Sequence, residues 1–403
     1  MKVRFKTFGC RLNKAESLDL EARFAAAGWT AAEHSQDADL VVVRACSVTS
    51  AAQRECEKYI ARLKALYPAK RIVVTGCTAS RSNEFLIDAL LKDGGGASAA
   101  GGARPQPVPV STARAWLKVQ DGCNSKCAFC IVPQFRSSSS SVPFDDAVDR
   151  AKRFVEAGYR EIVVTGCNLA QYSSGGRRLP ELVEALCSVG GCRIRLGSVE
   201  PGAIAGETVS AMAASPAACR FLHLSVQSGS DRILAAMKRP YFARDVRALA
   251  AAAQKAMPGI ALGCDMIAGF PGESEYDHFL SRQLLEDSGF TAAHVFPYST
   301  RPGTAAAAMS GGLPREVRSA RARDLSGIAE KAKSAFAAGF RGKTVEIVVE
   351  DAETTAGWTS QRLWCEVSKG YCAAWPGGKP ERKALAKIAV RSAKGGRLCG
   401  VPA

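Results

Sequence analysis

Short apolar runs alternate with helical segments along most of the chain, and this alternation constrains its fold more than any other feature. The strand-like segments are residues 3–8, 40–44 and 71–76, then 116–120, 161–166, 192–200, 221–227, 260–269 and 292–299. Continuous apolar strands separated by helices are typical of parallel sheets covered on both faces. The first three predict a parallel α/β domain. The next six predict a full or partial (β/α) barrel, although periodicity alone also allows a doubly wound sheet.

Composition changes mark the expected domain boundaries. Residues 94–110 are rich in Gly, Ala and Pro, which predicts a linker that is flexible in its first half and extended in its second. A basic helix is expected within 315–343, and the β-rich sequence after it predicts a small barrel. We expect an α/β domain at 1–95, a linker at 96–112, the larger barrel at 113–338 and the small β-barrel at 339–403.

The charge balance and cysteine content narrow the classes of function. Lys and Arg number 54 against 38 Asp and Glu, a net charge of +16, which favours a polyanionic partner such as nucleic acid over a merely basic soluble protein. The longest uncharged stretch has 15 residues, too few for a membrane span of about 20. The N-terminus has no apolar signal core, so we expect a cytoplasmic protein. In that compartment, 15 cysteines favour metal binding or catalysis over disulfides.

One group of cysteines has the spacing of a metal-cluster loop. Cys123, Cys127 and Cys130 follow the first strand of the barrel region, which would place them at the carboxyl mouth where barrel active sites are built. A [4Fe–4S] cluster held by three thiolates keeps one iron open to another ligand. A zinc site or three unrelated thiols are the alternatives. Zinc ribbons prefer paired C-x2–4-C elements and a fourth ligand, and no other Cys or His is near in the sequence, so the spacing favours iron and sulfur.

A second group of cysteines recurs at the ends of the first strands. Cys10, Cys46 and Cys77 each follow one of the three strand-like segments of the N-terminal region. Parallel sheets form their sites at the carboxyl ends of the strands, so these three thiols are expected to converge. Buried structural cysteines are the alternative. The repeated placement favours a second three-cysteine cluster with its own open iron.

The loop CNSKCAFC resembles the cluster-binding loop of the radical SAM superfamily. Together, the two cysteine groups and the segments 223–241, 265–279 and 296–309 make nearly the whole chain similar to the methylthiotransferase family of that superfamily. The resemblance implies an N-terminal domain with an auxiliary [4Fe–4S] cluster, a radical SAM partial barrel and a TRAM-like β-barrel that binds RNA. It also implies S-adenosylmethionine as methyl donor and as source of a 5′-deoxyadenosyl radical, with the auxiliary cluster supplying sulfur.

The resemblance also suggests a substrate. The segments LKVQDGCN, EIVVTGCNLAQY and IRLGSVEP are most similar to the branch that adds a methylthio group to C2 of N6-threonylcarbamoyladenosine, next to the tRNA anticodon. Sister branches act on isopentenyl-adenosine in tRNA or on an aspartate of a ribosomal protein. An RNA-binding protein with a non-catalytic metal is the alternative from another class. The partners implied are a tRNA anticodon stem-loop and an electron donor such as flavodoxin or ferredoxin.

Further residues are expected at the cofactor and RNA sites, and no side-chain acid or base is predicted. By resemblance or by position at strand ends, the S-adenosylmethionine site would include Gly166, Asn168, Ser198, Glu200, Gln227 and Gly269. The basic helix and the terminal module offer RNA contacts at Arg315, Arg318, Arg321, Lys343 and Trp358. The alternatives are tight turns for the glycines, a solvated face for the basic helix and a packed core for the tryptophan.

Three features depart from the family pattern. Arg44 and Ala45 precede Cys46 where the family usually has Asn-Thr. After the cluster loop, Arg136 is followed by serines, 137–141, in place of an Arg-Gly segment with further basic residues, and this serine run is expected to be a loop. The terminal module is short and only weakly TRAM-like. These departures concern substrate recognition more than cluster binding.

Overall fold

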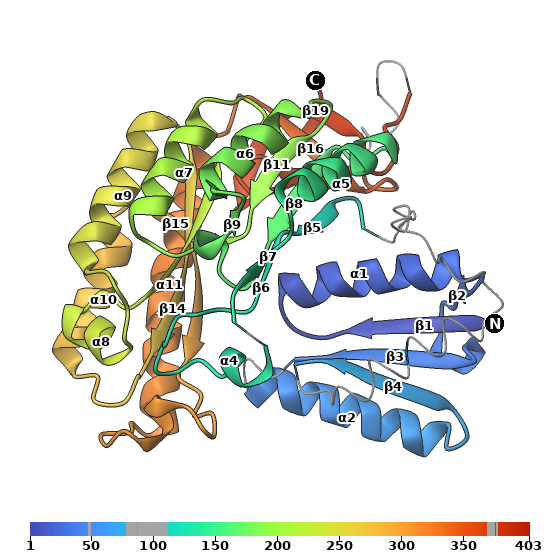
Figure 1. The fold of residues 1–403 in the computed structure, drawn as a ribbon. Coiled ribbons are helices and arrows are strands. Elements are labelled where there is room, and N and C mark those ends of the chain that lie inside the picture. Colours follow the sequence, from blue (N-terminus) through green and yellow to red (C-terminus); the bar gives the residue numbers. More distant parts are fainter. Residues whose placement is uncertain (47–49, 78–86, 88–111, 137, 369–374, 376–377) are drawn as a thin grey trace.

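The computed structural model describes residues 1–46, 50–77, 87, 112–136, 138–368, 375 and 378–403. Figure 1 shows three parts: an N-terminal domain in blue, a larger domain from green to orange, and a small β-rich module in red at one end of the larger domain. The predicted linker at 94–110 lies outside the described residues. Within the part of the chain that is described, no helix is long and apolar enough to cross a membrane.

The N-terminal domain is the predicted parallel α/β unit. Its sheet has the order β2-β1-β3-β4, and all neighbours are parallel. The strands are β1 (Lys2–Thr7), β2 (Thr30–Ala31), β3 (Leu40–Ala45) and β4 (Arg71–Gly76), and the helices are α1 (Arg11–Ala26) and α2 (Ser50–Leu66). Val42 packs with Phe24 of α1, whereas Val43 packs with Leu63 of α2. Because the apolar sides of helices cover both faces of the sheet, β3 is an uninterrupted apolar run.

The central domain is a partial (β/α) barrel. Its strands are β5 (Ala115–Lys118), β8 (Glu161–Thr165), β11 (Arg193–Leu196), β12 (Ser198–Val199), β13 (Phe221–Gln227), β14 (Ala261–Ala268) and β15 (Phe290–Pro297). They pair in parallel and in sequence order, as β5-β8-β11 and β12-β13-β14-β15, with Gly197 between the two sheets. This sequential order excludes the doubly wound alternative, in which the strand order reverses. The described strands β5 and β15 do not pair, so the barrel is open along one side.

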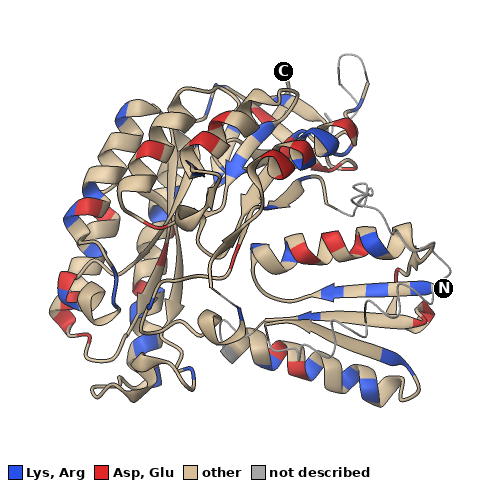
Figure 2. Ribbon diagram, in the orientation of Figure 1, with Lys and Arg blue, Asp and Glu red and all other residues tan. Residues whose placement is uncertain are grey.

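Helices cover the outside of the barrel. They are α5 (Phe144–Glu156), α6 (Leu179–Ser188), α7 (Ala203–Ala213), α8 (Asp231–Ala236), α9 (Ala243–Ala256), α10 (Glu275–Asp287) and the long basic α11 (Arg315–Ala338). Shorter elements are α4 (Val132–Phe135), β6 (Gln120–Asp121), β7 (Ser140–Ser141), β9 (Ser173–Ser174) and β10 (Arg177–Arg178). Because β7 pairs with β6, the expectation of a loop throughout the serine run is wrong at Ser140 and Ser141. Figure 2 shows Lys and Arg interspersed with Asp and Glu along α2 and α5.

The two faces of the barrel strands differ in polarity. In β13, Leu222, Leu224 and Val226 belong to the apolar core under the helices. Since successive side chains point to opposite faces, Phe221 and His223 point into the barrel. The same alternation turns Glu161, Arg195 and Asp265 inward. The interior of the barrel, called the chamber below, is therefore lined largely by polar side chains, in contrast to the packed apolar core of a closed eight-stranded barrel.

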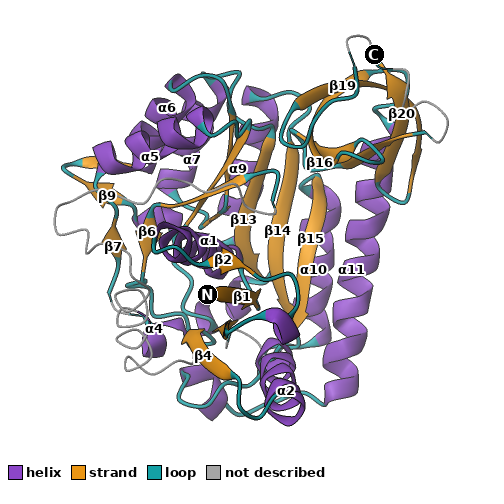
Figure 3. Cartoon of the chain, turned by 90° about the vertical axis from the view of Figure 1, so that its right-hand side faces the viewer, coloured by secondary structure: helices purple, strands orange, loops and turns teal. Residues whose placement is uncertain are grey.

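The N-terminal domain covers the open side of this chamber. Helix α1 packs on β5 and β8, and Lys118 Nζ of β5 lies 2.6 Å from Glu16 Oε1 of α1. Figure 3 looks onto this side, with the N-terminal domain facing the viewer. The chamber is thus closed by residues from both domains.

The C-terminal module closes one end of the barrel. It is a closed barrel of order β16-β17-β18-β20-β19, with β16 (Thr344–Asp351), β17 (Ala356–Thr359), β18 (Trp364–Val367), β19 (Leu385–Lys394) and β20 (Arg397–Pro402). Arg193 donates to the Trp358 carbonyl, and Arg195 donates to the Thr359 carbonyl at 2.8 Å. Glu161, which is 0% exposed, holds both arginines at 2.6 and 2.7 Å. These contacts fix the module on the amino-terminal ends of the strands.

Candidate active site

The three cysteines of the cluster loop lie between β6 and α4 at the carboxyl mouth of the barrel. A tight turn, in which the Cys130 N–H donates to the Cys127 carbonyl at 3.1 Å, brings Cys130 back beside Cys127. Arg239 Nη1 lies 3.0 Å from Cys127 Sγ, and Asn168 Nδ2 lies 4.0 Å from Cys123 Sγ. Burial raises the pKa of the Cys130 thiol to about 11, so iron would have to displace protons to bind. Three thiols on one loop, with N–H donors directed at sulfur, fit a [4Fe–4S] cluster bound at three corners.

Polar side chains form a shell next to this loop. Asn168 donates to Glu200 Oε2 at 3.0 Å, and the same carboxylate oxygen lies 3.3 Å from Arg239 Nη2. The Asn168 N–H donates to Gln120 Oε1 at 2.9 Å, and a Cβ on Gly166 would come within 2.9 Å of Gln120. Only glycine therefore lets Gln120 reach the backbone of Asn168. This shell can hold the polar groups of a bound cofactor.

The other three predicted cofactor residues lie farther along the strands. Ser198 Oγ is 3.4 Å from Asp265 Oδ2, inside the chamber. Gln227 ends β13 with a φ of 74°, which is uncommon for a residue with a side chain. Gly269 also has a positive φ, of 74°, and a Cβ there would collide with Arg318 of α11. Gly269 is thus required for close packing of α11 on the turn after β14.

The second cysteine group lies together at the carboxyl edge of the N-terminal sheet. Cys10 precedes α1, Cys46 follows β3, and Cys77 follows β4. Asn13 holds the ends of β1 and β3 together, because its Nδ2 donates to the carbonyls of Phe8 and Ala45, both at 2.9 Å. The Cys77 N–H donates to the same Ala45 carbonyl at 3.3 Å. The arrangement fits a cluster bound at three corners, as parallel strand ends are expected to provide.

Cys10 is the exposed member of this group and borders the space between the two domains. It lines a cavity of about 600 Å³ together with Arg11 of α1 and Trp116 of β5, the first barrel strand. The cavity therefore lies between the N-terminal domain and the first barrel strand.

Arg136 links the segment of the first cysteine group to the second group. It follows the cluster loop and α4, and its Nη2 lies 3.9 Å from Cys77 Sγ. The same guanidinium contacts Glu16 at 2.8 Å and Asp121 at 2.6 Å. Burial would raise the pKa of Glu16, but Arg136, Arg44 and Lys118 hold that pKa well below its usual range. Arg44, one of the departures from the family pattern, and Arg136 thus meet at one carboxylate that joins the domains.

A histidine–aspartate cluster in the chamber was not predicted. His223 Nε2 and His294 Nδ1 lie 3.0 and 3.3 Å from Asp265 Oδ1. Burial lowers the pKa of His223 in spite of the hydrogen bond to Asp265, and the charge of Arg11 acts in the same direction. The three residues occupy neighbouring strands and are separated by 42 and 29 positions, so only their shared inward direction could have indicated the cluster.

The predicted RNA-binding residues do not form one face. Arg315 and Lys343 are exposed, and Trp358 is half-buried and donates from Nε1 to Glu350. Arg318 donates to the Tyr298 carbonyl. Arg321 is only 6% exposed and pairs with Glu273 at 2.8 Å, so a role of Arg321 in RNA contact is excluded by its burial.

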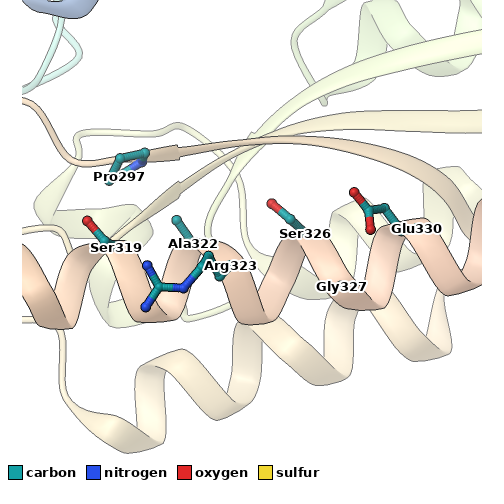
Figure 4. Close-up of a pocket in the computed structure, with 7 residues that line it drawn as sticks. All are labelled: Pro297, Ser319, Ala322, Arg323, Ser326, Gly327 and Glu330. Atoms are coloured by element: carbon teal, nitrogen blue, oxygen red, sulfur yellow. The ribbon is translucent and has the colours of Figure 1, made fainter.

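A separate hollow of about 430 Å³ lies along α11 and the end of β15 (Figure 4). It is lined by Pro297, Ser319, Ala322, Arg323, Ser326, Gly327 and Glu330. None of the predicted site residues is among them. Its small and charged side chains carry no chemistry that connects it to the cysteine groups.

A partial (β/α) barrel of six successive units, with a three-cysteine loop after its first strand, defines a radical SAM protein. Residues 117–280 match the family model described as the radical SAM superfamily, and residues 2–93 match the model described as uncharacterized protein family UPF0004. A solved radical S-adenosylmethionine methyltransferase, TsrM from Kitasatospora setae, shares the fold with a TM-score of 0.54 and 13% identity, over 76% of this chain and 75% of that one.

Curated relatives cover most of the chain. A tRNA-2-methylthio-N(6)-dimethylallyladenosine synthase from Cereibacter sphaeroides (strain ATCC 17029) is 34% identical over 88% of this chain and 89% of its own length. The threonylcarbamoyladenosine tRNA methylthiotransferase MtaB of Bacillus subtilis (strain 168) is 31% identical over 87% of this chain and 85% of its own. The chain belongs to the tRNA methylthiotransferase family of radical SAM enzymes. Its cofactors are S-adenosylmethionine and [4Fe–4S] clusters.

Proposed function

We propose that this enzyme adds a methylthio group to C2 of N6-threonylcarbamoyladenosine next to the anticodon of tRNA. In the net reaction, the C2–H bond of the modified adenine is broken and a C2–S bond is formed. The observation that carries the proposal is the proximity of the two cysteine groups: Arg136, which follows the loop of Cys123, lies with its Nη2 3.9 Å from Cys77 Sγ. A base held between them would have both sources of chemistry within one space.

The cysteines have separate roles in this proposal. One set, Cys123, Cys127 and Cys130, would hold the cluster that binds S-adenosylmethionine, and the other set, Cys10, Cys46 and Cys77, would hold the auxiliary cluster. When bound, these groups supply the radical that removes hydrogen, the sulfur and the methyl group. The protein positions them, as is usual where cofactors do the difficult chemistry. The division follows the expected domains at 1–95 and 113–338.

The polar shell beside the cluster loop would bind S-adenosylmethionine. Asn168 and Glu200 are candidates for its charged amino acid end, since Asn168 lies near Cys123 and Glu200 pairs with Arg239, which contacts Cys127. Arg239 would keep Glu200 oriented. Gly166 keeps this shell in place because it leaves room for Gln120. Ser198 lies near Asp265, whereas Gln227 lies at the end of β13 and Gly269 at the turn after β14, where they would shape the site through the backbone.

The tRNA would reach the chamber by its anticodon stem-loop. A base must leave the stacked loop to enter a chamber of this kind, and single-stranded loops allow this at modest cost. The net charge of +16 and the exposed Arg315 and Lys343 favour contact with the phosphate backbone. We expect the module at 339–403 to contribute to that contact, in the cytoplasm, with flavodoxin or ferredoxin as the electron donor.

Nucleoside mass analysis tests the proposal. In tRNA from cells that lack the gene, 2-methylthio-N6-threonylcarbamoyladenosine should disappear while its precursor without the methylthio group accumulates. A plasmid carrying the gene should restore the product, and the Cys10→Ala variant should not. Unchanged methylthio-threonylcarbamoyladenosine in the deletion strain would refute the proposed substrate.

Dimethylallyladenosine is the second candidate substrate. The observation in its favour is the 34% identity to the Cereibacter sphaeroides synthase of the dimethylallyl product, against 31% for MtaB. The same experiment separates the two candidates, because the two precursors differ in mass. Loss of the methylthio-dimethylallyl product alone would assign the enzyme to that substrate.

A further inference from the structure

Two arginines enter the chamber from different domains without an acidic partner. Arg11 lies in the first turn of α1, directly after Cys10, and Arg362 lies between β17 and β18 of the C-terminal module. Among the described residues, neither guanidinium forms an ion pair or a hydrogen bond with another side chain, and Arg11 Nη1 is buried without any partner. Both residues are half-buried. A half-buried cation without a partner is less well solvated than a free one, so such a pair favours binding of an anion.

The position of Arg362 is fixed by the docked module. Its N–H donates to the Thr359 carbonyl at 3.0 Å, and the Leu363 N–H donates to Thr359 Oγ1 at 3.0 Å. Its φ of 62° is left-handed, a conformation that costs a residue with a side chain about 1–3 kcal/mol. The turn directs the guanidinium over the ring of Phe221, 5.1 Å from its centre, at the start of β13. The strained turn is thus held in place by the contacts that dock the module on the barrel.

The charges around the two arginines do not balance. Arg193 and Arg195 share Glu161, while Asp265, which contacts His223 and His294, is a carboxylate whose charge by itself would raise the pKa of both Arg11 and Arg362 without forming an ion pair with either. Burial, followed by the repulsion of Arg11 and other arginines, lowers the pKa of Arg362 to about 9. Burial likewise lowers the pKa of Arg11. A bound anion would relieve both the desolvation and the repulsion.

Aromatic rings line the wall next to these cations. The ring centres of Phe221 and His223 are 6.0 Å apart, and those of His223 and His294 are 5.0 Å apart. Gly263 makes room for this row, since a Cβ there would come within 2.6 Å of His223 Nδ1. Phe221 and His223 are each 1% exposed, whereas His294 is exposed. The ring of His294 can therefore contact a flat base while the arginines accept the charge of an anionic substituent.

We propose that Arg11 and Arg362 together bind the carboxylate of the threonylcarbamoyl group and thereby select this nucleoside over the dimethylallyl one. This inference rests on the proposed function. A carboxylate accepts hydrogen bonds from guanidinium groups in fixed planar geometry. A dimethylallyl group would leave both half-buried cations unpaired, and a site built for a polar group strongly rejects an analogue that lacks it.

Equilibrium binding of small probes to the reconstituted full-length enzyme tests the site. The probes are N6-threonylcarbamoyladenosine and its methyl ester, which differ in the negative charge. The wild type should bind the acid at least about tenfold more tightly than the ester, the range of one charged hydrogen bond. Both Arg11→Gln and Arg362→Gln should lose most of this preference. The matched control Arg391→Gln, at an exposed position of the same C-terminal module, should keep it.

Two further measurements make every outcome informative. If the arginines bind an RNA phosphate instead, Arg362→Gln will weaken the binding of tRNA that carries unmodified adenosine as much as the binding of tRNA that carries threonylcarbamoyladenosine. That result overturns the inference. Arg362→Lys, with normal iron content, should recover part of the acid preference even if the glutamine variant fails to fold. If the wild type methylthiolates threonylcarbamoyladenosine and all variants still bind the acid more tightly than the ester, only this inference is overturned. A wild type that does not act on that tRNA overturns the proposed function first.

Discussion

Replacing Glu161 by Gln tests whether one buried carboxylate holds the C-terminal module on the barrel. Glu161 is 0% exposed and accepts hydrogen bonds from Arg193 Nε at 2.6 Å and from Arg195 Nε at 2.7 Å. Both arginines use their remaining N–H groups on carbonyls of the module, such as that of Thr359. Glutamine keeps the size of the side chain but removes the charge, so the two arginines would be left buried with insufficient compensation.

Two independent arguments give the size of the effect. Removing one partner of a buried charged network typically costs about 3–5 kcal/mol of the free energy of unfolding. Burial would raise the pKa of Glu161, but Arg195 and Arg193 lower it to about 2 from an ordinary value of 4.5. A difference of that size corresponds to about 3 kcal/mol of stability at neutral pH. The two arguments agree.

Thermal unfolding of the iron-free chain measures the effect without interference from cluster loss. At pH 7, Glu161→Gln should lower the melting temperature of the barrel and module by about 6–12 °C. The control Glu156→Gln, on the exposed side of α5, should leave it unchanged. A shift of less than about 2 °C for Glu161→Gln would refute the view that this carboxylate compensates the arginines.

The pH dependence of the same difference gives a second check. Because the pKa of Glu161 is lower in the folded chain than in the unfolded one, its stabilisation is complete above about pH 4.5. It is lost as the pH falls from there toward 2. The difference in stability between wild type and Glu161→Gln should therefore be constant from neutral pH down to about 5 and shrink below that. A difference that grew on acidification would contradict the assignment.

Three further predictions concern the site. Cys123→Ala should abolish formation of 5′-deoxyadenosine, measured by chromatography, whereas Cys10→Ala should retain it and stop methylthio insertion. The reverse result would exchange the roles of the two clusters. Arg136→Gln should lower methylthio product per 5′-deoxyadenosine by about tenfold and speed hydrogen exchange in α1, since charged hydrogen bonds between the domains are lost. An unchanged ratio would show that Arg136 does not align them. Gly263→Ala should destabilise the chain by about 1–3 kcal/mol in urea unfolding, because the added Cβ overpacks the ring of His223.

The effect expected of Arg136 depends on its double contact. It reaches Cys77 Sγ on the N-terminal domain while it pairs with Asp121 of β6, which lies two residues before Cys123. A shift of this side chain would therefore move one cysteine group relative to the other. Transfer between two sites depends steeply on their mutual position. The yield of methylthio product per 5′-deoxyadenosine should therefore fall before either cysteine group loses its iron.

The sequence by itself determined the order of the elements and the position of the cysteines. The alternation of apolar strands with amphipathic helices is local, and parallel connections place successive strand ends at one edge. The thiols of Cys10, Cys46 and Cys77 could therefore be assigned to a common edge without coordinates. The same reasoning identified the loop of Cys123 as the mouth of the barrel.

Charge along a helix was a weaker guide. The basic helix was predicted correctly, but Arg321 was assigned to its RNA-facing side and is buried against Glu273 and Glu275. The reason is that a guanidinium can be accepted in the interior when a carboxylate from another element meets it. Sequence composition gives the number of charges and does not show which of them find a partner.

Only the tertiary structure decided which side chains from distant segments meet in the chamber. Glu16 meets Arg136 across 120 positions, and Arg11 enters the same chamber as Arg362 from the opposite end of the chain. His223, Asp265 and His294 come together because three neighbouring strands are in a register that no local pattern specifies. Hydrogen bonds and charges act over a few ångströms, and the packing of whole domains sets which groups come within that range.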